Sequence, residues 1–176
     1  MFYALFFGAV LVLLFRPGSR VRSYSMTLKE QIRDAIKKEI VEPLNLGLTA
    51  EDALYAHAVL ETGDFKAKYF SMPGPAGEPP TWSMWNRHKG SGRGDWSGLV
   101  RYISKDDPDL RTFEDVYQCA RDFRQLLTDP LYKGAYLALR ANNPGSYFDA
   151  LQAAGFSGTA KTTYAQSLKR TYESIV

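Results

Sequence analysis

The sequence predicts a mainly α-helical domain with a small irregular or β lobe, preceded by a hydrophobic helix at the N-terminus. Three observations indicate this arrangement. Apolar residues recur every three or four positions in several segments, which is the helical period. Segment 71–98 is instead rich in glycine and proline and holds all three tryptophans. Segment 2–15 has no charged residue. These features divide the chain into 1–16, 17–26 and 27–176.

The uncharged N-terminal segment is predicted to anchor the chain in a membrane, and 17–26 to be a basic linker. As a helix, residues 2–15 would span about 21 Å, which is less than the ~30 Å hydrocarbon core of a bilayer. A signal peptide and a buried core helix are the alternatives, but no A-x-A cleavage pattern follows the segment. Arg16, Arg20 and Arg22 would contact lipid headgroups.

Composition excludes several classes of function. The 176 residues suit one domain, and a net charge of +3 is too small to favour nucleic acid as the partner. A slightly basic domain is compatible with an anionic polymer. Because Cys119 is the only cysteine and the chain has two histidines, we expect no disulfide, no metal site and no cofactor.

Capping and periodicity predict the order of the helices. "TLKE" is a capping box in which Thr27 caps a helix and Glu30 reaches back to it. That helix shows an apolar stripe and ends before Pro43, and Thr49 is predicted to cap the next helix, which runs to about Glu61. Helices are predicted to resume at Thr112, and Asp129-Pro130 is predicted to break the first of them. The later ranges are 131–141, 146–154 with Gly155 as its C-cap, and a last helix from 164.

The predicted irregular lobe is segment 71–98, followed by "LVRYIS" at 99–104 as the most strand-like run. A loop of this length inside a compact domain is uncommon and usually functional. Its tryptophans could cover the apolar faces of sugar rings, and Trp85 is predicted to face a binding cleft. Packing of these tryptophans beneath the loop is the alternative.

The helix in "DALYAHAVLETGDF" ends at a carboxylate, Glu61. Glu61 shares a helix face with Leu54, His57 and Ala58. A carboxyl group against such a surface loses hydration, so we expect its pKa to rise and its proton to be available near neutral pH. A general acid that protonates a leaving oxygen needs this property. An exposed glutamate in the last turn is the alternative, and His57 is expected to be a packed core histidine rather than a base.

Five motifs in the order and spacing seen here resemble a known family. They are "AHAVLETGDF", "WNRHKG", "VRYIS", "TFEDVYQCARDFRQLLTDPLYKGAYLA" and "FDALQAAGFSGTAKTTYAQSLKRTYESI". Residues 27–175 resemble the glucosaminidase-type peptidoglycan hydrolases, which include the wall-cutting domain of the flagellar rod assembly protein and many autolysins. The resemblance implies a lysozyme-like α-fold that cleaves the glycan strands of peptidoglycan.

By the same resemblance, Glu61 matches the catalytic acid and Tyr164 matches a tyrosine that lines the sugar site. Tyr102 and Asn86 match two further positions, and Phe156 stands where the family has a tyrosine. Asp64-Phe65 replaces a Trp-Gly pair of the family. We expect these departures from the family pattern to affect how the substrate fits the site and how active the protein is.

Glycoside hydrolysis usually needs a second carboxylate. Asp95 in "GRGDW" is the predicted partner of Glu61, because the family's second acid also comes from this lobe. Assistance from the substrate's own N-acetyl group is the alternative. The other candidate carboxylates are Glu78, Asp106 and Asp107.

The sequence therefore predicts a peptidoglycan glycosidase bound to a bilayer through residues 2–15, in a bacterial envelope or the membrane of a phage virion. The positive-inside rule would leave the domain in the cytoplasm, where a wall-cutting enzyme does not meet its substrate. A virion-associated lysin, delivered to the wall later, is one way to resolve this conflict. Two other functions stay open. One is a catalytically silent peptidoglycan-binding or structural membrane protein, and the other is a lytic transglycosylase. Oligomeric state is not predicted.

Overall fold

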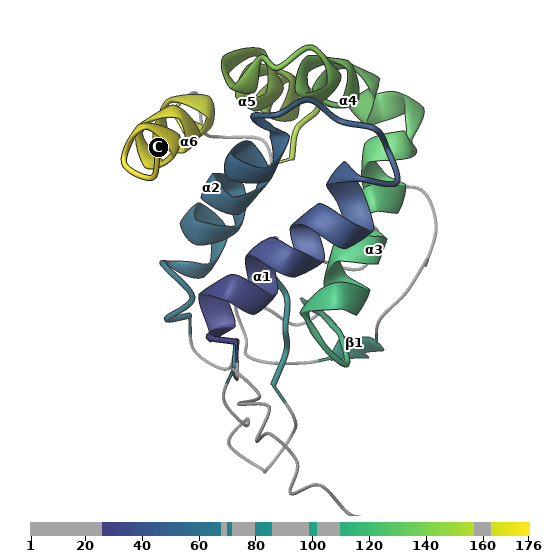
Figure 1. The fold of residues 1–176 in the computed structure, drawn as a ribbon, viewed down its shortest axis with the longest axis vertical. Coiled ribbons are helices and arrows are strands. Elements are labelled where there is room, and N and C mark those ends of the chain that lie inside the picture. The colour runs from purple at the N-terminus through teal and green to yellow at the C-terminus, as the bar shows by residue number, and fades with distance from the viewer. Residues whose placement is uncertain (1–25, 68–69, 72–79, 86–98, 102–109, 157–162) are drawn as a thin grey trace, which may run out of the picture.

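A computed structural model describes residues 26–67, 70–71, 80–85, 99–101, 110–156 and 163–176 (Figure 1). The predicted anchor at 1–16 and all but the last residue of the predicted linker lie outside these ranges. Within them, no helix combines the length and the apolar character that crossing a membrane requires. The described residues are mainly helical, as the periodicity of the sequence predicts.

The first helix begins where the sequence predicts. In α1 (Leu28–Ile36), Thr27 accepts from the Glu30 amide and the Glu30 carboxylate accepts from the Thr27 amide, so the capping box is present. A π-helical turn, Lys37–Val41, continues it and ends before Pro43. The buried residues of this stretch are Ile32, Ala35, Ile36 and Ile40, and they form the predicted stripe.

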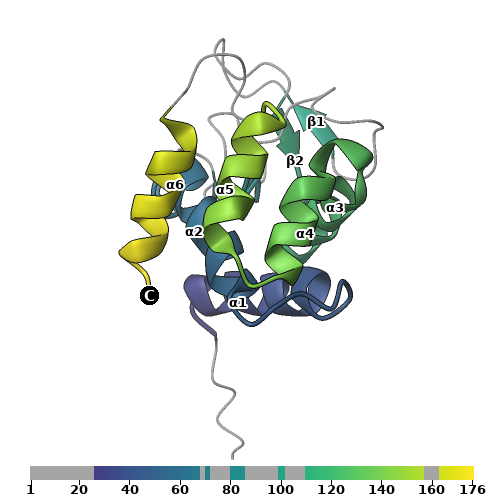
Figure 2. The same cartoon turned by 90° about the horizontal axis from the view of Figure 1, so that it is seen from above.

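Helix α2 (Ala50–Thr62) is the central helix of the domain. It packs against α1, α5 and α6, and Figure 2 shows α6, α5 and α4 side by side above α1 with α2 behind them. Four small residues of α2, Ala50, Ala53, Ala56 and Ala58, are fully buried, which allows neighbouring helices to approach closely.

Thr49 occupies the N-cap position of α2, as predicted, but not with the side-chain hydrogen bond that a threonine cap usually makes. The Thr49 side chain makes no capping hydrogen bond to α2. Its backbone amide instead donates to Oδ1 of Asn142, at 3.2 Å, from the loop between α4 (Lys133–Arg140) and α5 (Pro144–Ala153). The chain is therefore held at this helix start by a contact that is remote in sequence.

The small lobe contributes two short strands among the described residues. β1 (Leu99–Arg101) pairs antiparallel with β2 (Leu110–Thr112), with Leu99 opposite Thr112. β1 covers the start of the predicted strand. The predicted helix start at Thr112 is wrong, because Thr112 ends β2 and the Phe113 amide donates to the Thr81 carbonyl at 2.9 Å.

Helix α3 (Val116–Thr128) therefore begins after Asp115, whose carboxylate accepts from the Gln118 amide at 2.7 Å. It ends at Asp129-Pro130 as predicted, and a 3₁₀ turn, Pro130–Tyr132, leads into α4. Asn143 caps α5, and Gly155 follows that helix with a φ of +75°, which glycine adopts at little cost. The last helix is α6 (Tyr164–Glu173).

Candidate functional site

Glu61 occupies the last turn of α2, and its side chain is 17% exposed. Leu54, His57 and Ala58, which share its helix face, are all fully buried. The carboxyl group thus reaches the surface from an otherwise buried helix face. The prediction of an apolar setting for Glu61 agrees with this placement.

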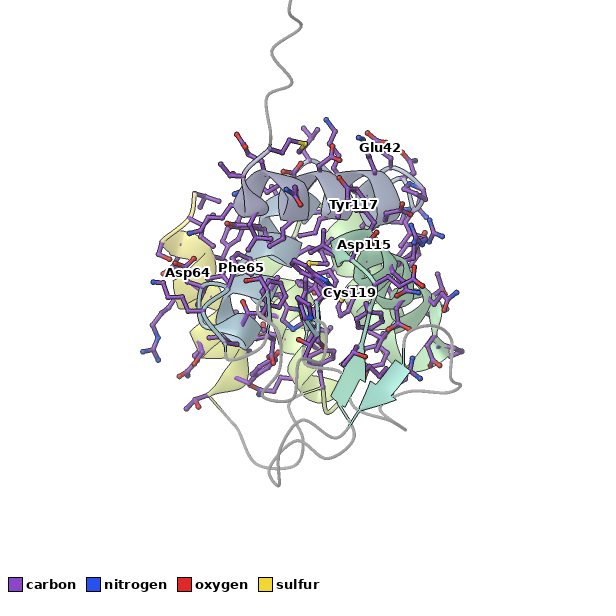
Figure 3. All side chains as sticks on the ribbon, turned by 90° about the horizontal axis from the view of Figure 1, so that it is seen from below. Glu42, Asp64, Phe65, Asp115, Tyr117 and Cys119 are labelled. Atoms are coloured by element: carbon purple, nitrogen blue, oxygen red, sulfur yellow. The ribbon has the colours of Figure 1, made fainter. Side chains whose placement is uncertain are left out.

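A left-handed turn ends the helix directly after Glu61. Gly63, Asp64 and Phe65 have φ values of +57°, +58° and +61°. Thr62 stabilises this turn, because its hydroxyl donates to the Ala58 carbonyl at 2.6 Å and accepts from the Phe65 amide at 3.0 Å. Asp64 and Phe65 are both labelled in Figure 3.

The two non-glycine residues of the turn, Asp64 and Phe65, are also held by their side chains. Asp64 forms an ion pair with Lys29 at 2.7 Å. The Phe65 ring is buried and lies 5.6 Å from the ring centroids of Tyr55 and of Phe70. These contacts offset the backbone strain of two non-glycine residues at positive φ.

Tyr164, the first residue of α6, contacts Glu61 directly. Its hydroxyl donates to Oε1 of Glu61 at 2.5 Å, and the residue is only 6% exposed. Burial, followed by the charge of Glu61, raises the pKa of Tyr164 well above its ordinary value. The phenol therefore keeps its proton and acts as a hydrogen-bond donor at any working pH.

His57 lies one turn before Glu61 and is fully buried. Its Nε2 lies 2.9 Å from the Tyr164 hydroxyl oxygen, and its Nδ1 lies 2.9 Å from the hydroxyl oxygen of Tyr147 on α5. Burial lowers the pKa of His57 to about 3. The imidazole is therefore neutral near pH 7, so its 3.9 Å approach to Glu61 is not an ion pair.

These contacts have one consistent direction of donation. A phenol has a single hydrogen, and that of Tyr164 points to Glu61. The Tyr164 oxygen must then accept from Nε2–H of His57. Since a neutral imidazole has one N–H, Nδ1 is an acceptor and Tyr147 donates to it. The chain of donors runs Tyr147 to His57 to Tyr164 to Glu61.

Aromatic rings enclose the imidazole. Phe156 and Phe123 present T-shaped contacts to His57 at centroid distances of 4.8 Å and 5.6 Å. Phe156 also stacks on Tyr164, with an angle of 23° between the rings. This apolar enclosure is the cause of the lowered His57 pKa, because it disfavours the charged imidazolium.

The predicted site residues divide into three groups. Glu61, Tyr164 and Phe156 lie together. Trp85 does not face a cleft: it is 1% exposed and stacks on Phe123 at 4.2 Å, so its indole packs inside the core. The predicted residues Asn86, Asp95 and Tyr102 lie outside the described residues.

Sequence reasoning missed Tyr147, and it treated His57 only as a packed core histidine. Both residues lie among buried apolar neighbours, Tyr147 beside Phe148 on α5 and His57 between Ala56 and Ala58 on α2. A buried tyrosine or histidine needs a polar partner. That requirement was a signal that each residue had one, although the sequence could not say which.

In the part of the chain that the structure describes, no group of three or more His, Cys, Asp or Glu side chains could hold a metal ion. Among the described residues, the hydrogen-bonded chain that reaches Glu61 joins its carboxylate to two phenols and one neutral imidazole. These groups can bind and transfer protons.

Comparisons with solved structures identify the fold. A mutant peptidoglycan hydrolase from Sphingomonas sp. A1 matches with a TM-score of 0.57 and 21% identity, over 81% of this chain and 83% of that one. The catalytic domain of the autolysin Auto from Listeria monocytogenes matches with a TM-score of 0.51 and 17% identity, over 88% of each chain. The chain has the fold of these peptidoglycan hydrolases.

A third match, the C-terminally truncated glycoside hydrolase domain of FlgJ from Salmonella typhimurium, has a TM-score of 0.50 and 19% identity, over 81% of this chain and 96% of that one. The fold that the sequence resemblance implies is therefore confirmed. No protein-family model matches the chain, and no curated protein sequence matches it.

Proposed function

We propose that this protein hydrolyses glycosidic bonds in the glycan strands of peptidoglycan, with Glu61 as the general acid. The observation that supports this most directly is the Glu61 carboxyl group, 17% exposed and held by the Tyr164 hydroxyl at 2.5 Å. The fold, which is that of solved peptidoglycan hydrolases, supports the choice of substrate.

Glu61 can act as an acid in this arrangement because its two oxygens can have different roles. Oε1 accepts from Tyr164, and the other oxygen can hold the proton that passes to the leaving glycosidic oxygen. As that proton leaves, the carboxyl group becomes an anion. Its hydrogen bond to Tyr164 then becomes charge-assisted and stronger. Tyr164 thus stabilises the transition state more than the ground state, which is the condition for catalysis.

A water molecule must then attack the anomeric carbon and lose a proton. In the proposal, either Asp95 accepts this proton or the substrate's N-acetyl group first attacks the carbon. The distance between two catalytic carboxyl groups predicts the stereochemical outcome. Replacement of Asp95 by asparagine tests the choice: loss of turnover supports the carboxylate, and unchanged turnover supports the N-acetyl group.

Digestion of purified sacculi tests the proposed activity. The full chain should clear sacculi in a zymogram and release reducing ends. Glu61→Gln should abolish both while circular dichroism shows an intact fold. Glu173→Gln is the matched control, because Glu173 is an exposed residue of α6. Clearing by Glu61→Gln at the wild-type rate would overturn the assignment of the acid.

The products separate the alternatives on the same fold. Hydrolysis leaves reducing sugar ends, whereas a lytic transglycosylase leaves anhydro-muramic ends that mass spectrometry distinguishes. A catalytically silent wall-binding protein would sediment with sacculi and release neither product. Binding without release would therefore contradict the proposed hydrolysis.

We also propose that residues 2–15 attach the enzyme to a bilayer, in a cell envelope or a phage virion; this part rests on the sequence alone. The full chain should float with liposomes in a density gradient. A Leu11→Arg, Leu13→Arg double variant should not, because charged residues are costly in the bilayer centre. Flotation of both proteins would reject the anchor.

A further inference from the structure

Two buried side chains lie behind the proposed acid and cannot touch a substrate. His57 and Tyr147 are both fully buried. They are joined at 2.9 Å, and His57 continues at 2.9 Å to the Tyr164 hydroxyl. Burial of two polar side chains has a cost in desolvation. Replacing both members of such a pair by apolar groups of similar shape is often nearly neutral for stability. The pair therefore needs an explanation beyond stability.

We propose that His57 is a positioning residue: its Nε2–H, specified by donation from Tyr147 to Nδ1, orients the Tyr164 hydroxyl so that it donates to Glu61. This inference rests on the proposed function and deepens it, because it assigns roles to two residues that do not contact the substrate. The directions of donation follow from the single hydrogen on each group.

The geometry explains why an oriented donor matters here. A phenol hydrogen can rotate about the C–O bond, and Tyr164 has two partners, His57 and Glu61. Donation from Nε2–H occupies the Tyr164 oxygen, so the Tyr164 hydrogen is directed to Glu61. With the other tautomer, Nε2 would be a bare acceptor that competes for the same hydrogen. Donation from the Tyr147 hydroxyl to Nδ1 favours the Nε2–H tautomer over this one.

The surroundings of His57 keep it in the neutral form that this arrangement needs. Within the described part of the chain, the groups that face it are the Phe156, Phe123 and Trp85 rings and the two tyrosines, with the Glu61 carboxyl group at 3.9 Å. A protonated imidazole would place a positive charge beside Glu61 and favour the carboxylate over the acid. It would also have no acceptor at Nδ1 for the Tyr147 hydrogen.

Variants of the full chain test the positioning role. Glutamine in place of His57 retains one donor and one acceptor, whereas leucine retains neither. We expect His57→Gln to keep kcat on sacculi within about threefold of wild type. We expect His57→Leu to lower kcat by about tenfold to a hundredfold, the usual effect of a misplaced catalytic group. KM should stay within about twofold of wild type for both variants, because the side chain at position 57 is buried and does not touch the substrate.

Tyr147→Phe provides a second arm if His57→Leu does not fold. It removes the hydroxyl that donates to Nδ1 and retains the buried ring. Its kcat should fall without a change in KM. Equal kcat values for His57→Gln and His57→Leu, or a wild-type kcat for Tyr147→Phe, would overturn the positioning role.

Nitrogen-15 NMR of histidine-labelled wild-type protein gives a readout that does not depend on activity. We expect the signals of one of the two histidine rings to show a protonated Nε2 and an unprotonated Nδ1, unchanged from pH 5 to pH 8. These signals should be absent from the spectrum of His57→Gln. An Nδ1–H tautomer would overturn the inference. A wild-type chain that releases no product from sacculi would instead overturn the proposed function, and the spectrum would still decide the direction of the hydrogen bonds.

Discussion

The Tyr164 hydroxyl lies 2.5 Å from Oε1 of Glu61, although the two residues are 103 positions apart in the chain. Glu61 is in the last turn of α2, and Tyr164 is the first residue of α6. The site therefore depends on the packing of α6 against α2 and α5, which the structure shows as direct contacts among these three helices.

Tyr164→Phe should weaken both stability and activity. The change leaves the ring stacked on Phe156 but removes the partner of a buried Nε2–H of His57. An unsatisfied buried donor costs about 1–3 kcal/mol in the free energy of unfolding. Urea denaturation measures this loss, and turnover on sacculi should fall because Glu61 loses its donor. Tyr172→Phe, a half-buried tyrosine of the same helix, is the control.

Acid should destabilise the wild-type protein more than His57→Gln. The pKa of His57 is lowered from 6.5 to about 3 by burial, so between these values the unfolded state binds a proton that the folded state does not. Stability then rises with pH in this window and falls as the pH drops below 6.5. The slope is about 1.4 kcal/mol per pH unit.

Between pH 7 and pH 5, the wild-type protein should therefore lose about 2 kcal/mol more than His57→Gln. Urea denaturation at the two pH values measures the difference. Carboxylates whose pKa is lowered by hydrogen bonds, such as Asp34, also lose stabilisation in acid. They do so in both proteins, so the comparison isolates His57. Parallel losses in the two proteins would contradict a neutral buried imidazole.

Asp64→Val should destabilise the turn after Glu61 more than Asp64→Asn. Both changes remove the charge that pairs with Lys29. Asparagine tolerates the φ of +58° at this position, whereas a β-branched residue does not. We expect Asp64→Val to be less stable than Asp64→Asn by about 1–3 kcal/mol. Equal midpoints in urea would show that the turn relaxes when the side chain changes.

Gly47→Ala should destabilise the start of α2. A Cβ atom at residue 47 would lie 2.3 Å from Oδ1 of Asn142, the atom that accepts from the Thr49 amide. Displacing Asn142 removes that hydrogen bond, at a cost of about 1–2 kcal/mol. Gly134→Ala, within α4, is the control.

The control should be neutral or stabilising, because the new Cβ would lie 3.5 Å from the Ala150 Cβ, an ordinary contact. Alanine in place of glycine within a helix gains up to about 1 kcal/mol. Thermal unfolding of the two variants measures both effects. A loss at Gly134→Ala as large as that at Gly47→Ala would contradict the specific clash with Asn142.

The departure of this chain from the family pattern at 64–65 has a structural consequence. The family that it resembles has Trp-Gly there, and glycine adopts positive φ readily. Here Phe65 has a φ of +61° and is stabilised by ring contacts with Tyr55 and Phe70. Aromatic packing therefore holds a non-glycine residue at positive φ, four residues after the proposed acid.

Local signals in the sequence were reliable where the structure depends on neighbouring residues. The capping box at Thr27, the helix break at Asp129-Pro130 and the glycine at 155 were all predicted and are all present. The start of α3 was not predicted correctly, because pairing with β1 and the hydrogen bond to Thr81 hold Thr112 and Phe113 in an extended conformation. Those partners are remote in the sequence, and propensity does not reveal them.

The amino-acid order by itself determined the helical class, most helix boundaries and the position of Glu61 at the end of an apolar helix. Only the tertiary structure decided that Tyr164 and, through His57, Tyr147 converge behind that carboxylate, and that Trp85 turns into the core. The physical reason is the range of the interactions involved. Caps and turns depend on residues within one helical turn, whereas these hydrogen bonds join helices whose positions depend on the packing of the whole apolar core.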